Sequence, residues 1–143
     1  GEPYYSMHPP KSTGRELFNS TYAESILKNA PNNKFDIIAT ITALTARTIF
    51  DAYKKFVLPK TSIQEIVLGG GGAYNKALIK YLDTYFNNSV IIKTHKDFGI
   101  DDKFKEAIAF AMLGFCTLNK KCNNLELCTG AQKRVIMGVV SYS

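Results

Sequence analysis

Four consecutive glycines, Gly69 to Gly72, constrain the fold more than any other feature of this sequence. They follow the short apolar run Glu65–Leu68, and helical spacing of apolar residues resumes from Asn75 to Phe86. Glycine adopts backbone conformations that other residues avoid, and it lets a ligand approach the backbone closely. The pattern therefore predicts a strand, a glycine loop and a helix, in that order.

Other segments predict further helices. Capping boxes, in which a Thr hydroxyl and a Glu carboxylate satisfy backbone N–H groups at a helix start, are predicted at Thr13–Glu16 and Thr21–Glu24. The second opens a short helix that ends before Pro31. Two longer helices are predicted at 35–57 and at about 102–118. Their inward-facing residues recur every three or four positions, and they are Ile38, Ile41, Thr45, Ile49, Ala52 and Phe56 in the first and Phe104, Ile108, Ala111 and Phe115 in the second.

Two more strands are expected, one at Val90–Ile92 and one over residues 135–140, because both runs are rich in β-branched residues. Strands that alternate with helices indicate an α/β layered domain. The chain has 143 residues, of which 45% are hydrophobic and 21% charged, so one domain around one core is expected. The predicted fold class is α/β, with about three strands and flanking helices.

Bulk properties narrow the classes of function. No run of 18 apolar residues exists, so a membrane span is not predicted, and the first residues do not resemble a signal peptide. Cys116, Cys122 and Cys128 lack a close CxxC pair, which favours reduced thiols in a cytoplasmic protein. The net charge is +6, but the lysines are scattered, so solvated surface is favoured over nucleic-acid binding.

The glycine loop is the first candidate site, because the helix that begins near Asn75 would add its positive end to a nearby phosphate. The loop is not a GxxxxGK[ST] phosphate loop, and Tyr74 stands where GxGxxG needs glycine. A flexible tight turn is the alternative to a binding loop.

Glu106 is the second candidate, on a helix face of small residues, although a solvated helix charge is favoured by the pattern alone. Asp101 and Asp102 are interpreted as helix caps, and neither His8 nor His95 fits a metal site.

Six segments, in this order and spacing, resemble the anhydro-N-acetylmuramic acid kinase family of the sugar kinase, Hsp70 and actin superfamily. They are Pro10–Phe18, Ala39–Ala46, Gly70–Asn75, Gly99–Ile100, Glu106–Ala111 and Thr129–Ala131. The resemblance implies a partial ribonuclease-H-like (actin-like ATPase) domain. It also implies that residues 1–143 are the C-terminal part of the kinase's second domain, without the N-terminal domain and the phosphate-loop strands.

The resemblance implies roles for individual residues. Gly70, Gly71, Gly72 and Asn75 would line the adenosine side of the ATP site, and Glu106 would lie near the anhydrosugar. In the family, water opens the 1,6-anhydro bridge at C1 while the freed O6 takes the γ-phosphoryl group of ATP, with Mg²⁺ screening the phosphate charge. The base is an aspartate that the family carries upstream of the matched region. No catalytic residue is therefore expected here, and the chain alone is expected to be inactive.

Two alternatives stay open. Levoglucosan kinases share the same chemistry, so the anhydrosugar is not fixed by these residues. A noncatalytic nucleotide-binding or interaction domain would also retain the glycine loop. Self-association into a homodimer is a further expectation, because apolar surface that meets the missing strands in the family would be exposed.

Overall fold

The computed structural model describes residues 2–28, 30 and 33–141. The chain divides into two compact units, one of Gly1–Met7 and Thr13–Thr94, the other of His8–Ser12 and His95–Ser143. Among the described residues, no helix has the length and apolar character that crossing a membrane requires.

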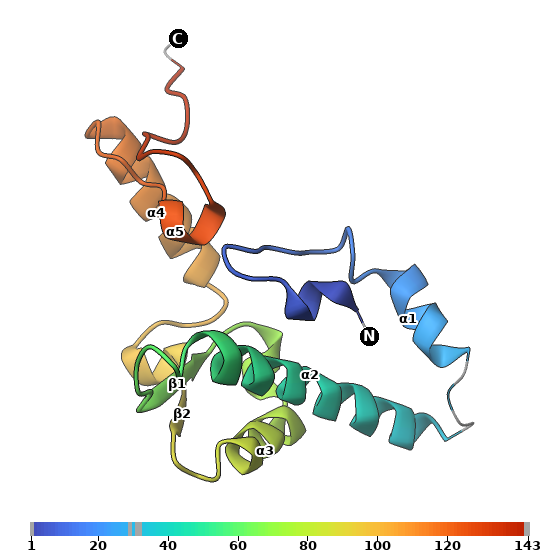
Figure 1. The fold of residues 1–143 in the computed structure, drawn as a ribbon. Helices are drawn as coiled ribbons and strands as arrows, with labels where there is room; N and C mark the ends of the chain where they lie inside the picture. The colour runs from blue at the N-terminus through green and yellow to red at the C-terminus, as the bar shows by residue number, and fades with distance from the viewer. Residues whose placement is uncertain (1, 29, 31–32, 142–143) are drawn as a thin grey trace. The chain divides into compact units, whose positions relative to one another are not determined.

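The first unit is a helix-rich layer beside a small sheet (Figure 1). Its elements in chain order are the 3-10 turn η1 (Pro3–Ser6), α1 (Ser20–Leu27), α2 (Lys34–Phe56), β1 (Glu65–Leu68), the 3-10 turn η2 (Gly71–Tyr74), α3 (Lys76–Tyr85) and β2 (Ile91–Thr94). The predicted order of strand, glycine loop and helix is thus confirmed, and so is the α/β class.

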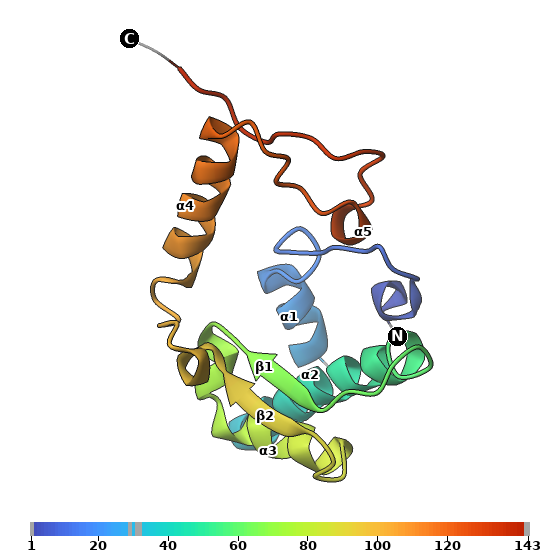
Figure 2. The same cartoon turned by 90° about the vertical axis from the view of Figure 1, so that its left-hand side faces the viewer.

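The sheet consists of β1 and β2, which run parallel with Ile66 opposite Ile92 (Figure 2). Ile66 is buried and Ile92 is half-buried, whereas Val67 and Ile91, which point to the other face, are 43% and 59% exposed. Successive side chains of a strand point to opposite faces. The sheet therefore has one face packed on the core and one face open.

The core lies between the sheet, α3 and the second half of α2. Its buried members are Ala46, Ile66, Leu78, Leu82, Phe86 and Val90. The bounds of α2 match the prediction closely, but the predicted inward stripe is wrong in its first half, where Ile38 and Ile41 are 64% and 37% exposed. Only the second half of α2 packs against this core, through Ile49, Phe50 and Tyr53.

Both predicted capping boxes are wrong in detail. Asn19 caps α1, because its side-chain oxygen accepts from the N–H of Tyr22 at 2.9 Å, two residues before the predicted Thr21. The helix ends at Leu27, and its predicted limit at Pro31 lies outside the described residues. No helix begins at Thr13. The Glu16 carboxylate instead accepts from the N–H of Gly14 at 2.6 Å and closes a turn.

The second unit contains the 3-10 turn η3 (His95–Phe98), the helix α4 (Lys105–Leu118) and the short helix α5 (Glu126–Thr129). The α4 helix is confirmed, but its predicted buried face is not. Phe104, Ile108 and Phe115 are 61%, 44% and 62% exposed, and Ala111 is exposed as well. The tail instead contacts α4 through Thr117, whose hydroxyl donates to the carbonyl of Met137.

The third strand predicted at 135–140 is not formed within the described residues, so the sheet has two strands and not three. The backbone of this segment bonds to asparagine side chains where a strand would bond to a neighbour. The N–H of Val135 donates to Asn124 Oδ1 at 2.7 Å, and the N–H of Met137 donates to Asn123 Oδ1 at 2.6 Å.

Candidate functional site

The glycine loop begins where β1 ends, at the carboxyl edge of the parallel pair. Gly70 has a φ of +71°, a conformation that residues with a side chain rarely adopt. From Gly71 the chain makes the turn η2, in which the N–H of Ala73 donates to the carbonyl of Gly70 at 3.1 Å. Ligands of open α/β sheets bind outside the carboxyl ends of the strands. The loop therefore stands at the edge where such a ligand is expected.

The two sides of the loop differ. A Cβ placed on Gly70 or Gly71 would meet no atom within 4 Å, whereas one on Gly72 would lie 3.4 Å from Leu78 Cδ2. Gly72 thus rests on the core residue Leu78, and Ala73 is buried beside it. Gly70 and Gly71 face open space. A ligand atom could approach the Cα of either residue from the side where a Cβ would stand.

Asn75 joins the loop to α3. Its side-chain oxygen accepts from the N–H groups of Ala77 and Leu78, each at 3.1 Å, so Asn75 is the N-cap of the helix. The side chain is exposed, and its Nδ2 group donates to no described residue. The oxygen is therefore occupied by capping, and the amide hydrogens are the part of Asn75 that remains able to donate to a ligand.

Glu106 lies in the second unit, in the first turn of α4, where it is exposed. The helix has Phe104 as its N-cap residue, without a side-chain hydrogen bond. A carboxylate in the first turn interacts favourably with the positive end of the helix. Glu106 therefore occupies the position of an ordinary solvated helix charge, and it also presents a free carboxylate to any ligand of this helix end.

The interpretation of Asp101 and Asp102 as helix caps is wrong, because the N-cap residue of α4 is Phe104. Asp101 Oδ1 accepts from the N–H of Lys103 at 2.8 Å, within the turn that precedes the helix. Asp102 instead lies 2.9 Å from Nδ1 of His95, with its side chain only 6% exposed. The pairing fastens the turn η3 to the segment before α4. Sequence spacing gave no signal for it, because seven positions separate the two residues in irregular chain.

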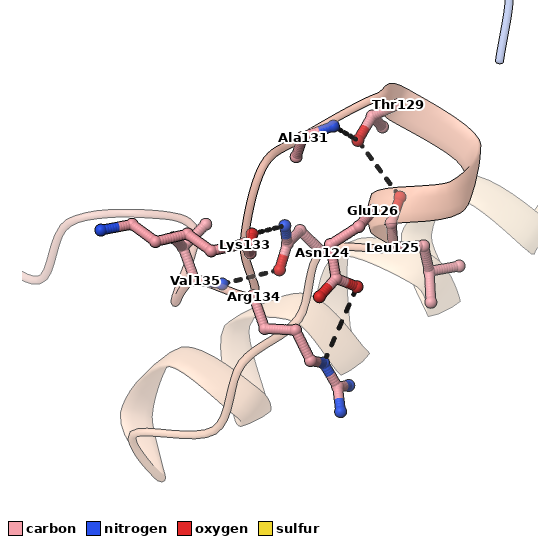
Figure 3. Close-up of polar contacts among 8 residues, drawn as sticks. All are labelled: Asn124, Leu125, Glu126, Thr129, Ala131, Lys133, Arg134 and Val135. Carbon is pink, nitrogen blue, oxygen red and sulfur yellow. Dashed lines mark hydrogen bonds and ion pairs between the residues drawn. The ribbon is translucent and has the colours of Figure 1, made fainter.

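Two adjacent asparagines, Asn123 and Asn124, bind the backbone of residues 133–137, a contact that the sequence did not predict; Figure 3 shows the contacts of Asn124. Asn124, which is 5% exposed, donates through Nδ2 to the carbonyl of Lys133 at 2.9 Å, and its Oδ1 accepts from Val135. Asn123 does the same around Met137. The Asn123-Asn124 dipeptide was the available signal, since a buried amide needs partners for both of its ends.

The described residues contain no group of three His, Cys, Asp or Glu side chains that could hold a metal ion. Cys116, Cys122 and Cys128 are all free thiols, as the sequence predicts.

Comparison with known proteins gives one consistent result. A family profile described as anhydro-N-acetylmuramic acid kinase matches residues 1–143. A protein of that name from Francisella tularensis subsp. novicida is 47% identical over 141 residues, covering 98% of this chain and 36% of the relative. The relative from Clostridioides difficile is 41% identical over 139 residues, covering 96% and 36%. The chain thus spans about a third of the length of the curated relatives that it matches.

Proposed function

The chain belongs to the anhydro-N-acetylmuramic acid kinase family, and on that premise we propose that it is the nucleotide-binding C-terminal part of an ATP-dependent anhydrosugar kinase. The full-length protein would open the 1,6-anhydro bridge of anhydro-N-acetylmuramic acid and phosphorylate O6. We propose further that its fold is part of a ribonuclease-H-like domain of the actin-like ATPase kind. The parallel pair of strands supports that fold.

The observation that carries the proposal is the glycine turn at the carboxyl edge of β1. Gly70 and Gly71 leave open space over their backbone, and the amide of Asn75 lies one turn further along. Such a surface suits the flat, polar adenosine portion of ATP, which needs close backbone contact and a few donors. Glu106 would approach the sugar through its exposed carboxylate.

The reaction assigns the remaining roles outside these residues. Water adds at C1 as the bridging C1–O bond breaks, O6 takes the γ-phosphoryl group, and ADP leaves. Mg²⁺ bound to the nucleotide phosphates would screen their charge, and such an ion needs only one or two carboxylates from the protein. The aspartate that activates water is proposed to lie in the part of the kinase that this chain does not span. The chain alone would therefore bind nucleotide without turning over sugar.

A hybrid protein tests the proposal: the Francisella relative with its matched 141 residues replaced by those of this chain, called the hybrid below. We expect it to convert anhydro-N-acetylmuramic acid to a product heavier by one water and one phosphoryl group, resolved by mass spectrometry. If levoglucosan were the only sugar phosphorylated, the proposed substrate would become levoglucosan in place of anhydro-N-acetylmuramic acid. A folded hybrid that binds ATP and phosphorylates neither sugar would overturn the kinase assignment and favour a noncatalytic binding domain.

Gly71→Val tests the loop itself. Because a Cβ at Gly71 meets no atom, the substitution leaves the loop's packing intact while it obstructs ligand approach. We expect the KM of the hybrid for ATP to rise at least about tenfold. Gly114→Ala on α4 is the control, since its Cβ also meets nothing and lies outside the loop. An unchanged KM in Gly71→Val would remove the loop from the nucleotide site. Titration of the chain with ATP, followed by the amide resonances of residues 70–75, gives the same answer if the hybrid does not fold.

A further inference from the structure

The segment after α5 has the hydrogen-bonding pattern of a strand, although no strand lies beside it among the residues that the structure describes. The carbonyl of Val135 accepts from the backbone N–H of Asn123 at 3.1 Å, while the N–H of Val135 donates to Asn124 Oδ1. Two residues further on, both backbone groups of Met137 bond to Asn123. Alternate residues of an extended chain direct their backbone groups to the same side. One edge of the segment is therefore already satisfied.

The opposite edge belongs to Arg134 and Ile136. Neither their N–H nor their C=O groups bond to any residue that the structure describes. We call these four groups the 134–136 edge. The segment contains no proline, and Gly138, with a φ of +99°, ends the extended stretch. After Arg134 its side chains are apolar and exposed, with Val135, Ile136 and Met137 at 37%, 43% and 41%. A bare edge of this kind is a template for pairing with another strand.

We propose that the 134–136 edge pairs with a strand from the part of the kinase that this chain does not span. The match covers 36% of each of these curated relatives, so most of their polypeptide lies outside the matched part. A strand within the same protein competes at a high effective concentration, on the order of millimolar for a short flexible connection, so it outcompetes a second copy of the chain. Asn123 and Asn124 then bond one edge of the segment as a neighbouring strand would, and they leave the 134–136 edge facing away from them.

This inference rests on the chain's membership of a longer kinase and not on which sugar is phosphorylated. An unpaired N–H exchanges its hydrogen with solvent rapidly, and a strand neighbour slows that exchange. In the chain alone, we expect the amides of Val135 and Met137 to exchange slowly and those of Arg134 and Ile136 to exchange fast. In the hybrid, we expect exchange at Arg134 and Ile136 to slow by at least about a hundredfold. The Francisella relative itself, at the two aligned positions, serves if the hybrid does not fold.

Two outcomes would overturn the proposal. Fast exchange at Arg134 and Ile136 in the hybrid, or in the relative, would mean that no strand pairs there. Slow exchange at both positions in the chain alone, strengthening with protein concentration and accompanied by a dimer in sedimentation, would make a second copy the partner. Neither outcome depends on sugar phosphorylation, so failure of this inference and failure of the kinase assignment are separable.

A proline variant adds an independent measurement. Ile136→Pro removes one outward N–H and leaves the inner bond of Val135 to Asn124 in place. We expect its thermal midpoint to fall in the hybrid and to stay near that of the unsubstituted protein in the chain alone. Ile136→Val, which keeps the N–H, is the matched control. Equal losses from the proline in both proteins would show that residue 136 matters only for this unit's own folding, and the proposal would fail.

Discussion

The side-chain oxygen of Asn124 accepts the backbone N–H of Val135 at 2.7 Å, across eleven positions of the sequence. The same side chain donates to the carbonyl of Lys133. Among the described residues, Asn124 is the polar residue that is buried, at 5% exposed. Both ends of the amide are therefore occupied. The tail depends on this one residue for two of its backbone bonds.

Replacing Asn124 by Ala should leave the Val135 N–H and the Lys133 carbonyl without their partner. A fully buried group left unsatisfied costs about 1–3 kcal/mol, and these two bonds are partly buried, so we expect a total loss of roughly 1–3 kcal/mol in the free energy of unfolding of this unit. Urea unfolding, followed by amide exchange at Val135, measures the loss. Asn119→Ala is the control, because Asn119 is exposed and bonds only to the end of α4. Equal losses in the two variants would refute a special role for Asn124.

Asn75 offers a way to separate capping from ligand contact. Asp caps a helix as well as Asn does, whereas Ala removes the cap at a cost of about 1 kcal/mol. We expect Asn75→Asp to keep the thermal stability of the chain and to weaken ATP binding, because it loses the amide donors and adds a negative charge. Asn75→Ala should lower both. Isothermal titration measures ATP binding, and thermal melts measure stability. If Asn75→Asp bound ATP as well as the unsubstituted chain does, Asn75 would only cap the helix and would not contact the nucleotide.

Tyr5 should make the first unit sensitive to alkaline pH. Partial burial raises the pKa of its hydroxyl above the ordinary value of 10.0, and the neighbouring Tyr22 raises it further. The folded state therefore holds this proton more tightly than the unfolded state does. Its contribution to stability is complete below pH 10 and is lost as the pH rises above that value. Between pH 9 and 11, melts of Tyr5→Phe should lose less stability than those of the unsubstituted chain. Equal losses of stability with rising pH in Tyr5→Phe and in the unsubstituted chain would contradict the raised pKa of Tyr5.

The sequence predicted the elements better than it predicted what they bury. The strand at Glu65, the helix after the glycines and the long helix to Phe56 were all recognisable, because apolar spacing and glycine are local signals. The buried side of α4 was not, since periodicity identifies a face without showing what packs on it. Phe115 lies on the predicted face and is 62% exposed.

The candidate site shows the same division. Gly70 could be identified because a run of glycines signals unusual backbone, and the positive φ confirms that interpretation. Asp102 could not be assigned to His95, and Asn124 could not be assigned to Val135, because both contacts connect irregular segments. The proposed roles of Gly71, Asn75 and Glu106 in binding come from the family resemblance, and they stay predictions until the variants are measured.

The core of the first unit also bears on how the protein folds. Its buried residues run from Ala46 to Val90, so one uninterrupted stretch of chain supplies α2, the parallel strands and the helix between them. Contacts between residues close in sequence form quickly, because little loop entropy is lost in closing them. We expect this stretch to fold early, while a ribosome is still synthesising the tail. The glycine loop would then be in place before the residues after Thr94 have emerged.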